Sequence, residues 1–583
     1  MRPACKSHTD WMGSEGPPRV PDMEPVEGGL AEPTELEPDQ GTLALALPGR
    51  AATRSDWEKA AAGVLRKAGR LREGDADDAV WATLTRATLD GVGVSPLGSP
   101  DLTDATGDHA RPTSPGGRDV RVELRGSGDA RLNAEALADL AGGASSLWLH
   151  AGPDTDLAVV LDGVLLDLAG VVVDATSEPV ALAERFLAHL GDTTPAPGTN
   201  LGAPADASDD DLVAVARLAL DAGVLGMVVD ASAVHDRGAS DAQELGWSVV
   251  AAARVLRVLE EGGIDVEQAA GLVEFRYAAT DDQFPTIAKL RAARLLWSRL
   301  LQICEAEPAD QRQHAVTSRP MMSAYDPWVN MLRTTVAAFA ATVGGADAVT
   351  VQPFDRPLGR PDAFGRRIAR NQMALLTDEA HVGAVTDPAG GAWAVERLTH
   401  DLATAAWEVV QALESGASLD DAIAATVATR DEQVATRRLP ITGLTEFPNL
   451  AESLPERDGE PDHVRRYGAA FEALRDEPAA TPVFLATLGS VAEHTARATF
   501  ASNLFAAGGV AVATGSYEGQ PVVCLAGTDA AYDESGADTA AALRQAGAVR
   551  VVVAGKTREW ADDSCAMGVD ALSFLHRTRE ALA

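Results

Sequence analysis

The sequence predicts an α/β fold in two parts, a (β/α)8 barrel followed by a small doubly wound, flavodoxin-like domain. Between about residues 119 and 445, apolar strand candidates alternate with amphipathic helices. The stretch Thr317–Asp355 has the pattern of a helix, a tight stop and a buried strand. A second series of short apolar runs begins at Val483. Repeated strand and helix units over roughly 330 residues, without a doubly wound break, are typical of a barrel.

The N-terminal residues do not resemble the rest of the chain. Residues 1–42 are rich in Pro, Gly and Glu, a composition that buries too little apolar surface to order itself, so we expect a disordered acidic tail. From Ser55 the pattern becomes helical, with Asp56 and Glu58 in the opening turn. Residues 92–118 have the composition of a loop. We assign residues 43–445 to this helical segment plus the barrel.

Four apolar runs in the first half of the barrel region are the clearest strands. Each is four or more residues long and is bounded by polar or turn residues. Ser240 should cap a helix that runs to about Glu261 and ends at the glycine pair 262–263. The four predicted strands are Val120–Leu124, Ser146–His150, Gly226–Asp230 and Val273–Tyr277.

The stretch Thr317–Asp355 specifies one helix and one strand. Asp326 is a suitable N-cap, and Pro327 suits the first helical position, where a missing N–H costs nothing. The glycine pair 344–345 should end the helix, and Ala348–Gln352 should form a buried strand. The predicted apolar face of the helix consists of Trp328, Leu332, Val336, Phe339 and Val343.

The C-terminal part predicts a linker and a second domain. Residues 446–480 are a linker with one helix, Val464–Arg475, and residues 481–583 form an α/β domain of about 100 residues. Its predicted strands are Val483–Leu488, Val510–Thr514, Val522–Ala526 and Val549–Ala554.

Composition excludes several classes of function. The chain has 583 residues and a formal net charge of −37, which argues against nucleic acid or an anionic membrane as a partner. No apolar run reaches membrane-spanning length, and no signal-peptide core is visible. The cysteines lack metal-binding spacing, so we expect no metal site and a reducing cytoplasm. They are Cys5, Cys304, Cys524 and Cys565.

Several blocks resemble the acyl-CoA mutases that use adenosylcobalamin. The first is the pattern TS…DP…N…RTT…A…GG within Thr317–Asp355. KLRAARLLW at Lys289–Trp297, RIARNQ at Arg367–Gln372 and DPAGGAWAVE at Asp387–Glu396 follow that family in order and spacing. The resemblance covers about two-thirds of the chain and implies the same barrel, with a cobalamin-binding domain after it. It also implies a substrate-covering segment with a tyrosine and several arginines at residues 92–118, where this chain has few of either.

The resemblance also shows where this chain departs from the family. In the family, a histidine within Tyr-His-Met-Gln-Glu-x-Gly-Ala hydrogen-bonds the thioester carbonyl. Aligned on Gly238-Ala239, that position holds Ala233 and the preceding tyrosine is Ser232, so neither donor is present. One alternative is that His235 has moved into the role. The other is that His235 is an exposed loop histidine beside Asp236 and Arg237.

The small domain departs from the family in the same way. The family places Asp-x-His-x-x-Gly after the first strand, and its histidine ligates cobalt. In the direct register, Val491, Glu493 and Ala496 replace these three residues. Shifting by one residue brings His494 to the ligand position with Ala492 and Arg497 as partners, and we expect His494 to be a surface histidine. Further along, the family's serines are missing and only Gly555 of a glycine pair remains.

Other polar residues admit two interpretations. Thr350 and Gln352 close a predicted barrel strand, where catalytic groups gather, although Thr350 stands where the family often has histidine. Arg291, Arg294 and Arg319 either contact phosphate or carboxylate groups or form structural ion pairs.

A chain that keeps the family scaffold without its catalysts resembles the small (β) subunits of heterodimeric methylmalonyl-CoA mutases. The stretches FPNLAE and YGAAFEALRD are similar to that subunit. The resemblance implies a large-subunit partner that carries the adenosylcobalamin and an acyl-CoA substrate in the complex. We therefore expect no catalytic, cofactor-binding or metal residues on this chain. Two alternatives stay open: an active mutase with displaced residues, and a structural binding protein. No G-x-x-x-x-G-K-[ST] pattern supports a nucleotide-driven chaperone.

Overall fold

The computed structural model describes residues 52–100, 110–126, 128–175, 177–459 and 464–583. The chain divides after Thr83 into two compact units. The predicted tail, residues 1–42, and Cys5 lie outside the described residues.

The first unit is built around two helices, α1 (Arg54–Lys67) and α2 (Val80–Leu84). Thr53 caps α1, and its capping box with Asp56 satisfies the first free N–H groups of the helix. The Trp57 and Trp81 rings lie 4.7 Å apart, and the Trp81 indole donates to Glu58 at 2.7 Å. The helix predicted from Ser55 is therefore confirmed, and it begins one residue earlier.

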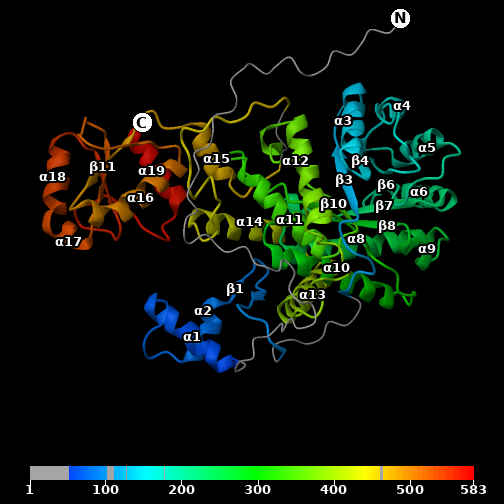
Figure 1. The fold of residues 1–583 in the computed structure, drawn as a ribbon, viewed down its shortest axis with the longest axis horizontal. Coiled ribbons are helices and arrows are strands. Elements are labelled where there is room, and N and C mark those ends of the chain that lie inside the picture. Colours follow the sequence, from blue (N-terminus) through cyan, green and yellow to red (C-terminus); the bar gives the residue numbers. More distant parts are fainter. Residues whose placement is uncertain (1–51, 101–109, 127, 176, 460–463) are drawn as a thin grey trace, which may run out of the picture. The chain divides into compact units, whose positions relative to one another are not determined.

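The second unit begins with a short antiparallel pair, β1 (Arg86–Ala87) and β2 (Gly93–Val94), and continues into a closed barrel of eight parallel strands. Figure 1 shows these eight strands with helices around them. The predicted (β/α)8 fold is thus confirmed. In barrel order the strands are β10 (Ala348–Thr350), β3 (Asp119–Leu124), β4 (Ser146–Ala151), β5 (Gly170–Ala175), β6 (Asn200–Pro204), β7 (Leu225–Asp230), β8 (Val273–Ala279) and β9 (Arg312–Thr317).

The helices bury apolar stripes against the outside of the barrel in one large core. The helix predicted after Ser240 is confirmed as α8, with a capping box from Ser240 to Gln243 and an end at Gly262. The helices of this unit up to the linker are α3 (Ala130–Ala141), α4 (Leu157–Val160), α5 (Pro179–Leu190), α6 (Asp209–Ala222), α7 (Ser232–Asp236), α8 (Asp241–Glu261), α9 (Val266–Ala270), α10 (Gln283–Ile303), α11 (Val329–Val343), α12 (Ala363–Ala374), α13 (Trp393–Glu414) and α14 (Leu419–Ala435).

The start of α11 differs from the prediction. Asp326 is not its N-cap, because it has a left-handed backbone (φ 47°) and its N–H donates to Glu452 at 2.9 Å. The helix begins at Val329, after a tight turn. Its buried face includes several alanines and Val343 of the predicted apolar stripe, while Trp328 and Leu332 of that stripe are 47% and 68% exposed. Small side chains let α11 lie close to the barrel, and Trp328 and Leu332 lie outside this contact.

The small domain is a five-stranded parallel sheet with the order β12-β11-β13-β14-β15. One face packs on α16 (Val491–Ala507) and α19 (Ala571–Leu582), and the other on α18 (Ala537–Gln545), so the domain is doubly wound as predicted. The linker helix α15 (Ala469–Asp476) starts later than predicted. The strands are β11 (Val483–Thr487), β12 (Val512–Ala513), β13 (Val522–Ala526), β14 (Arg550–Ala554) and β15 (Asp563–Cys565).

Within the described residues, no helix combines the length and apolar character that crossing a membrane requires. Cys304, Cys524 and Cys565 are free thiols, and no group of three potential metal ligands was found in the same residues.

Candidate functional site

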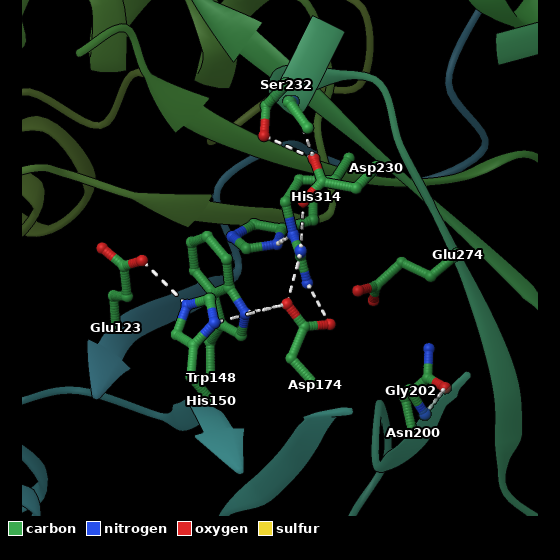
Figure 2. A network of polar contacts seen from close by, with 12 residues as sticks. Glu123, Trp148, His150, Asp174, Asn200, Gly202, Asp230, Ser232, Glu274 and His314 are labelled. Atoms are coloured by element: carbon green, nitrogen blue, oxygen red, sulfur yellow. Dashed lines mark hydrogen bonds and ion pairs between the residues drawn. The ribbon is translucent and has the colours of Figure 1, made fainter. Parts of the chain in front are cut away.

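The axis of the barrel is occupied by a bulky polar network. Arg276 of β8 stacks its guanidinium 4.0 Å from the ring centre of Trp148 on β4. It donates to Asp174 at 3.0 Å, to Asp230 at 2.8 Å and to His314 Nδ1 at 3.2 Å. Figure 2 shows the side chains of Trp148, Asp174, Asp230 and His314 converging from their separate strands. Because alternate residues of barrel strands point inward, these side chains fill the interior.

A second charged group lies deeper in the same interior. Arg121, which is fully buried, pairs with buried Glu274 at 2.7 Å and with Asp119 at 2.8 Å. Its Nε donates to Ser146 at 3.0 Å. Together with the apolar cluster Trp148, Val172, Val228 and Val316, these residues occupy space that a ligand threading the barrel would need.

Thr350 and Gln352 belong to this network. His314 Nε2 lies 2.7 Å from the Thr350 hydroxyl, which donates to the Arg121 carbonyl at 2.9 Å. Gln352 donates to Glu123 at 2.9 Å. Both predicted candidates are therefore used in packing the barrel interior.

The charges in the interior are matched to one another. Burial alone would raise the pKa of Asp174, but Arg276 and His150 hold it below its usual value. Burial, with Arg121 and Arg276, holds the pKa of His314 well below its usual value. His314 is thus neutral, as its acceptor role at Nδ1 requires. We therefore interpret His314 as a structural residue, because its neutral imidazole packs between groups that are already paired.

After β7, the structure contradicts one of the two interpretations of His235, that of an exposed loop histidine. His235 is not an exposed loop residue: it lies in α7, is 3% exposed, and its Nε2 is 2.7 Å from Ser318 Oγ and 3.4 Å from the Tyr467 hydroxyl. Ser232 donates to Asp230 at 2.5 Å. Ala233 is exposed and offers only a methyl group.

His235 lies beside a buried cluster of charges. Its Nδ1 is 3.6 Å from a Glu244 carboxylate oxygen and has no hydrogen-bond partner in the described residues. Lys289 pairs with Glu244 at 2.8 Å and with Asp241 at 2.9 Å. These ion pairs tie α10 to α8 behind the loop.

We expect His235→Ala to weaken the chain without slowing catalysis by an assembled complex. Loss of the buried hydrogen bond should lower the free energy of unfolding by about 1–3 kcal/mol. Turnover per assembled complex should stay nearly constant, whereas removing a thioester-polarising donor would cost a factor of about 100 or more. Thermal melts and steady-state assays, with His235→Gln as the conservative control, measure both quantities. A loss of that size in turnover, with assembly intact, would show that His235 has taken the catalytic role.

Two of the three predicted arginines form structural ion pairs. Arg291 contacts Asp387 and pairs with Glu396 at 2.7 Å, and it is fully buried. Arg319 contacts Asp236. The structural interpretation therefore accounts for both.

Arg294 is held by neutral acceptors. It donates to the carbonyls of Gly344 and Ala110 and to Gln313, with the Ala110 contact at 3.3 Å. Burial without a close carboxylate lowers its pKa to about 10. Its N–H groups fix the turn that ends α11.

The small domain's first helix keeps none of the expected ligand geometry. Glu493 accepts from the Ser490 N–H at 2.7 Å and from its hydroxyl at 2.7 Å, closing a capping box at the start of α16. Val491 is 73% exposed. His494 is half-buried, and in the described residues its Nδ1 has no partner.

At the carboxyl ends of β11, β13 and β14, the space is occupied by the side chain of Arg497. Arg497 donates to the Gly527 carbonyl at 2.8 Å, pairs with Asp529 at 3.0 Å and lies 5.1 Å from the Tyr532 ring centre. A Cβ added to Gly555 would lie 3.3 Å from the Arg497 guanidinium, so Arg497 lies against the one remaining glycine of the family's pair. The residues present do not fit a histidine-ligated corrin with its nucleotide tail. In one register Glu493 holds the ligand position, and in the other His494 has Ala492 in place of its aspartate and Arg497 in place of the glycine.

A cavity of about 480 Å³ lies at the carboxyl ends of the barrel strands. Residues after the carboxyl ends of β7, β8 and β9 line it, including His235, Asp281 and Met321, and Arg430 and Tyr467 line it as well. Active sites of barrel enzymes lie at this face.

Asp90 anchors one wall of this cavity and gives a pH-dependent prediction. It accepts from Ser240 Oγ and from the Ala242 N–H, and burial next to Asp241 raises its pKa from 3.8 to about 6. A raised carboxyl pKa means that the folded state holds its proton longer. The contribution of Asp90 to stability is therefore fully present below the pKa that the carboxyl has in the unfolded chain, and it is lost as the pH rises through the folded pKa of about 6.

Asp90→Asn should accordingly raise the free energy of unfolding above about pH 7 by about 1–3 kcal/mol, since the amide oxygen can still accept from the Ala242 N–H and the amide NH2 can donate to Ser240 Oγ, without the charge. Melting curves of both proteins between about pH 4 and pH 8 check this. Equal pH profiles would contradict it.

The sequence analysis did not predict the polar network inside the barrel or the placement of Arg430 and Tyr467 at the cavity. The signal for the first was present: Glu274 and Arg276 stand inside the apolar run of β8 at alternating positions. Charges inside a buried strand need partners, which predicts an ion-pair network. No local signal brings Arg430 and Tyr467 to the barrel.

Comparisons with known proteins agree with the family resemblance of the sequence. A family model described as methylmalonyl-CoA mutase matches residues 224–499. The chain is 43% identical to a methylmalonyl-CoA mutase small subunit of Streptomyces virginiae, over 93% of this chain and 98% of that one. It is 32% identical to a small subunit of Propionibacterium freudenreichii subsp. shermanii, over 95% and 98%. A methylmalonyl-CoA mutase large subunit of Streptomyces virginiae is 34% identical over 37% and 31%. This chain belongs to the methylmalonyl-CoA mutase family, and the relatives that it matches over most of its length are small subunits.

Proposed function

We propose that this chain is the non-catalytic small subunit of a heterodimeric methylmalonyl-CoA mutase in the cytoplasm. The assembly interconverts methylmalonyl-CoA and succinyl-CoA by a radical rearrangement, and adenosylcobalamin resides on the large subunit. The filled barrel interior carries the proposal. Arg276, Trp148 and Arg121 occupy the axis, and each is 1% exposed or less.

Two independent sites support the same conclusion. At the barrel face, the position of the family's histidine is Ala233, while His235 is engaged with Ser318 and Tyr467. In the small domain, Glu493 caps a helix where the family places the cobalt ligand. A subunit that is retained for its partner-binding surface should keep a packed core and lose both the thioester site and the cobalt-ligand site, which is the pattern of this chain.

The partner follows from the family plan. A large subunit built on the same fold can dock through the faces that pair identical chains in a homodimer, which gives a pseudo-symmetric heterodimer. An obligate interface of this kind should bury more than about 2,000 Å². The exposed Trp328 at the start of α11 is a candidate for such a surface.

A corrin titration of the isolated chain tests the proposal. Adding adenosylcobalamin should leave the corrin absorbance unchanged, because neither register of Ser490–Arg497 offers a histidine with its aspartate partner. The purified large subunit or complex is the positive control. A histidine-ligated, base-off spectrum at micromolar affinity would instead favour an active mutase with displaced residues.

A further inference from the structure

Asp281 and Arg333 are an acid and a base that line the cavity at the carboxyl ends of the barrel strands. In the described residues, neither has an oppositely charged group within 4.0 Å. Burial lowers the pKa of Arg333, and the strongest opposing attraction comes from Asp281. The two charges therefore face a shared space without closing on each other.

The position of Arg333 is fixed from behind. It is 7% exposed and donates to Asn330 at 2.8 Å and to the Thr442 carbonyl at 2.7 Å. A guanidinium has five N–H donors in a planar fork, so donors remain for an anion such as a carboxylate.

The other charged groups of the cavity wall are held by different partners. Asp282 pairs with Arg86 at 2.7 Å, and Asp241 pairs with Lys289 at 2.9 Å. Arg430 donates to the Gly238 and Ala239 carbonyls and stacks 4.7 Å from the Tyr467 ring centre. Asp90 accepts from the start of α8, as described above. Asp281 and Arg333 differ from these groups, because each is the strongest opposite charge that acts on the other.

The rest of the cavity near these two groups is apolar. Leu332 and Val336 of α11 lie on the same helix as Arg333, one residue before it and three after it, and both line the cavity with Met321, Leu439 and Ile441. A volume of about 480 Å³ is within the range of small-molecule sites, about 300–1,000 Å³.

We propose that this cavity binds a free α-amino acid with an apolar side chain. Its ammonium group would lie at Asp281, its carboxylate at Arg333 and its side chain against Leu332 and Val336. A zwitterion pairs with both groups and adds no net charge to the cavity, which an acid or an amine alone does not do. This site is separate from the question of catalysis, because it uses none of the residues that replace the family's catalysts.

Isothermal titration of the full chain with three matched probes tests the proposal. L-Leucine carries both charges, isopentylamine lacks the carboxylate and isocaproate lacks the amine. Leucine should bind at least about tenfold more tightly than either analogue, since each loses one charged hydrogen-bonding partner. Equal binding of leucine and one analogue would overturn the zwitterion assignment, as would no heat with leucine at millimolar concentration.

Two surface-accessible variants locate the site without threatening the fold. Asp281→Asn should weaken leucine about 10- to 100-fold and leave isocaproate unchanged, while the exposed Asp154→Asn serves as its control. Leu332→Ser, at 68% exposure, should weaken leucine about threefold to tenfold, with Leu168→Ser at 71% as its control. Leucine binding that is unchanged in both cavity variants would place the ligand elsewhere and contradict the inference.

Discussion

Replacing Arg276 with leucine should lower the free energy of unfolding by about 3–5 kcal/mol. The guanidinium is fully buried and pairs with Asp174 at 3.0 Å and Asp230 at 2.8 Å, so its removal leaves two carboxylates in the barrel without a counter-charge. The Trp148 ring also loses a stacked partner at 4.0 Å. Chemical denaturation of the wild-type and variant chains gives the difference directly.

A double variant separates unpaired charge from lost volume. Arg276→Leu combined with Asp174→Asn should recover part of the stability, because one of the stranded charges is gone. Arg257→Leu is the control for replacing an arginine by leucine, since Arg257 is 62% exposed, pairs with the exposed Glu414 and should change stability by less than about 1 kcal/mol. If Arg276→Leu were as mild as that control, the interior network would not be what holds the barrel closed.

Arg475→Ala should have the second-largest effect, about 2–4 kcal/mol. Arg475 of α15 donates to the Gly443 and Asn449 carbonyls at 3.2 and 2.7 Å, pairs with Glu452 at 2.5 Å and lies 4.0 Å from the Tyr325 ring centre. It therefore clamps the linker onto the loop that precedes α11. Without it, residues 443–452 should also become sensitive to limited proteolysis.

The control for the clamp is Arg438→Ala. Arg438 is 61% exposed and contacts Glu432 on the surface, so its loss should cost less than about 1 kcal/mol. Matching denaturation curves and digestion patterns for the two variants would contradict the clamp.

The sequence was sufficient for the architecture where periodicity is strong. β8 alternates apolar residues with Glu274 and Arg276, and α8 has its own capping box, so both could be predicted within about two residues. β6 could not be predicted in the same way, because its residues Asn200–Pro204 include Asn, Gly and Pro. The start of α11 was also missed, since a long-range contact from Glu452 takes the Asp326 N–H away from the helix.

For the candidate site, the sequence predicted only which of the family's functional residues are missing. The substitutions at Ala233 and Glu493 stand in the sequence, once the family's pattern is laid beside them. The burial of His235 was not predictable, because Ser318 and Tyr467 reach it from distant parts of the chain. The same holds for the cavity lined by Asp281 and Arg333, which depends on how the segment after β8 meets α11 above the barrel.

The central claim is that this chain supports a large subunit that alone carries the cofactor. Native mass spectrometry of the co-expressed pair, saturated with adenosylcobalamin, tests it most directly. The account predicts one copy of this chain, one large subunit and a single cobalamin in each complex. Two cobalamins per heterodimer, or a homodimer of this chain that binds cobalamin without a large subunit, would contradict it.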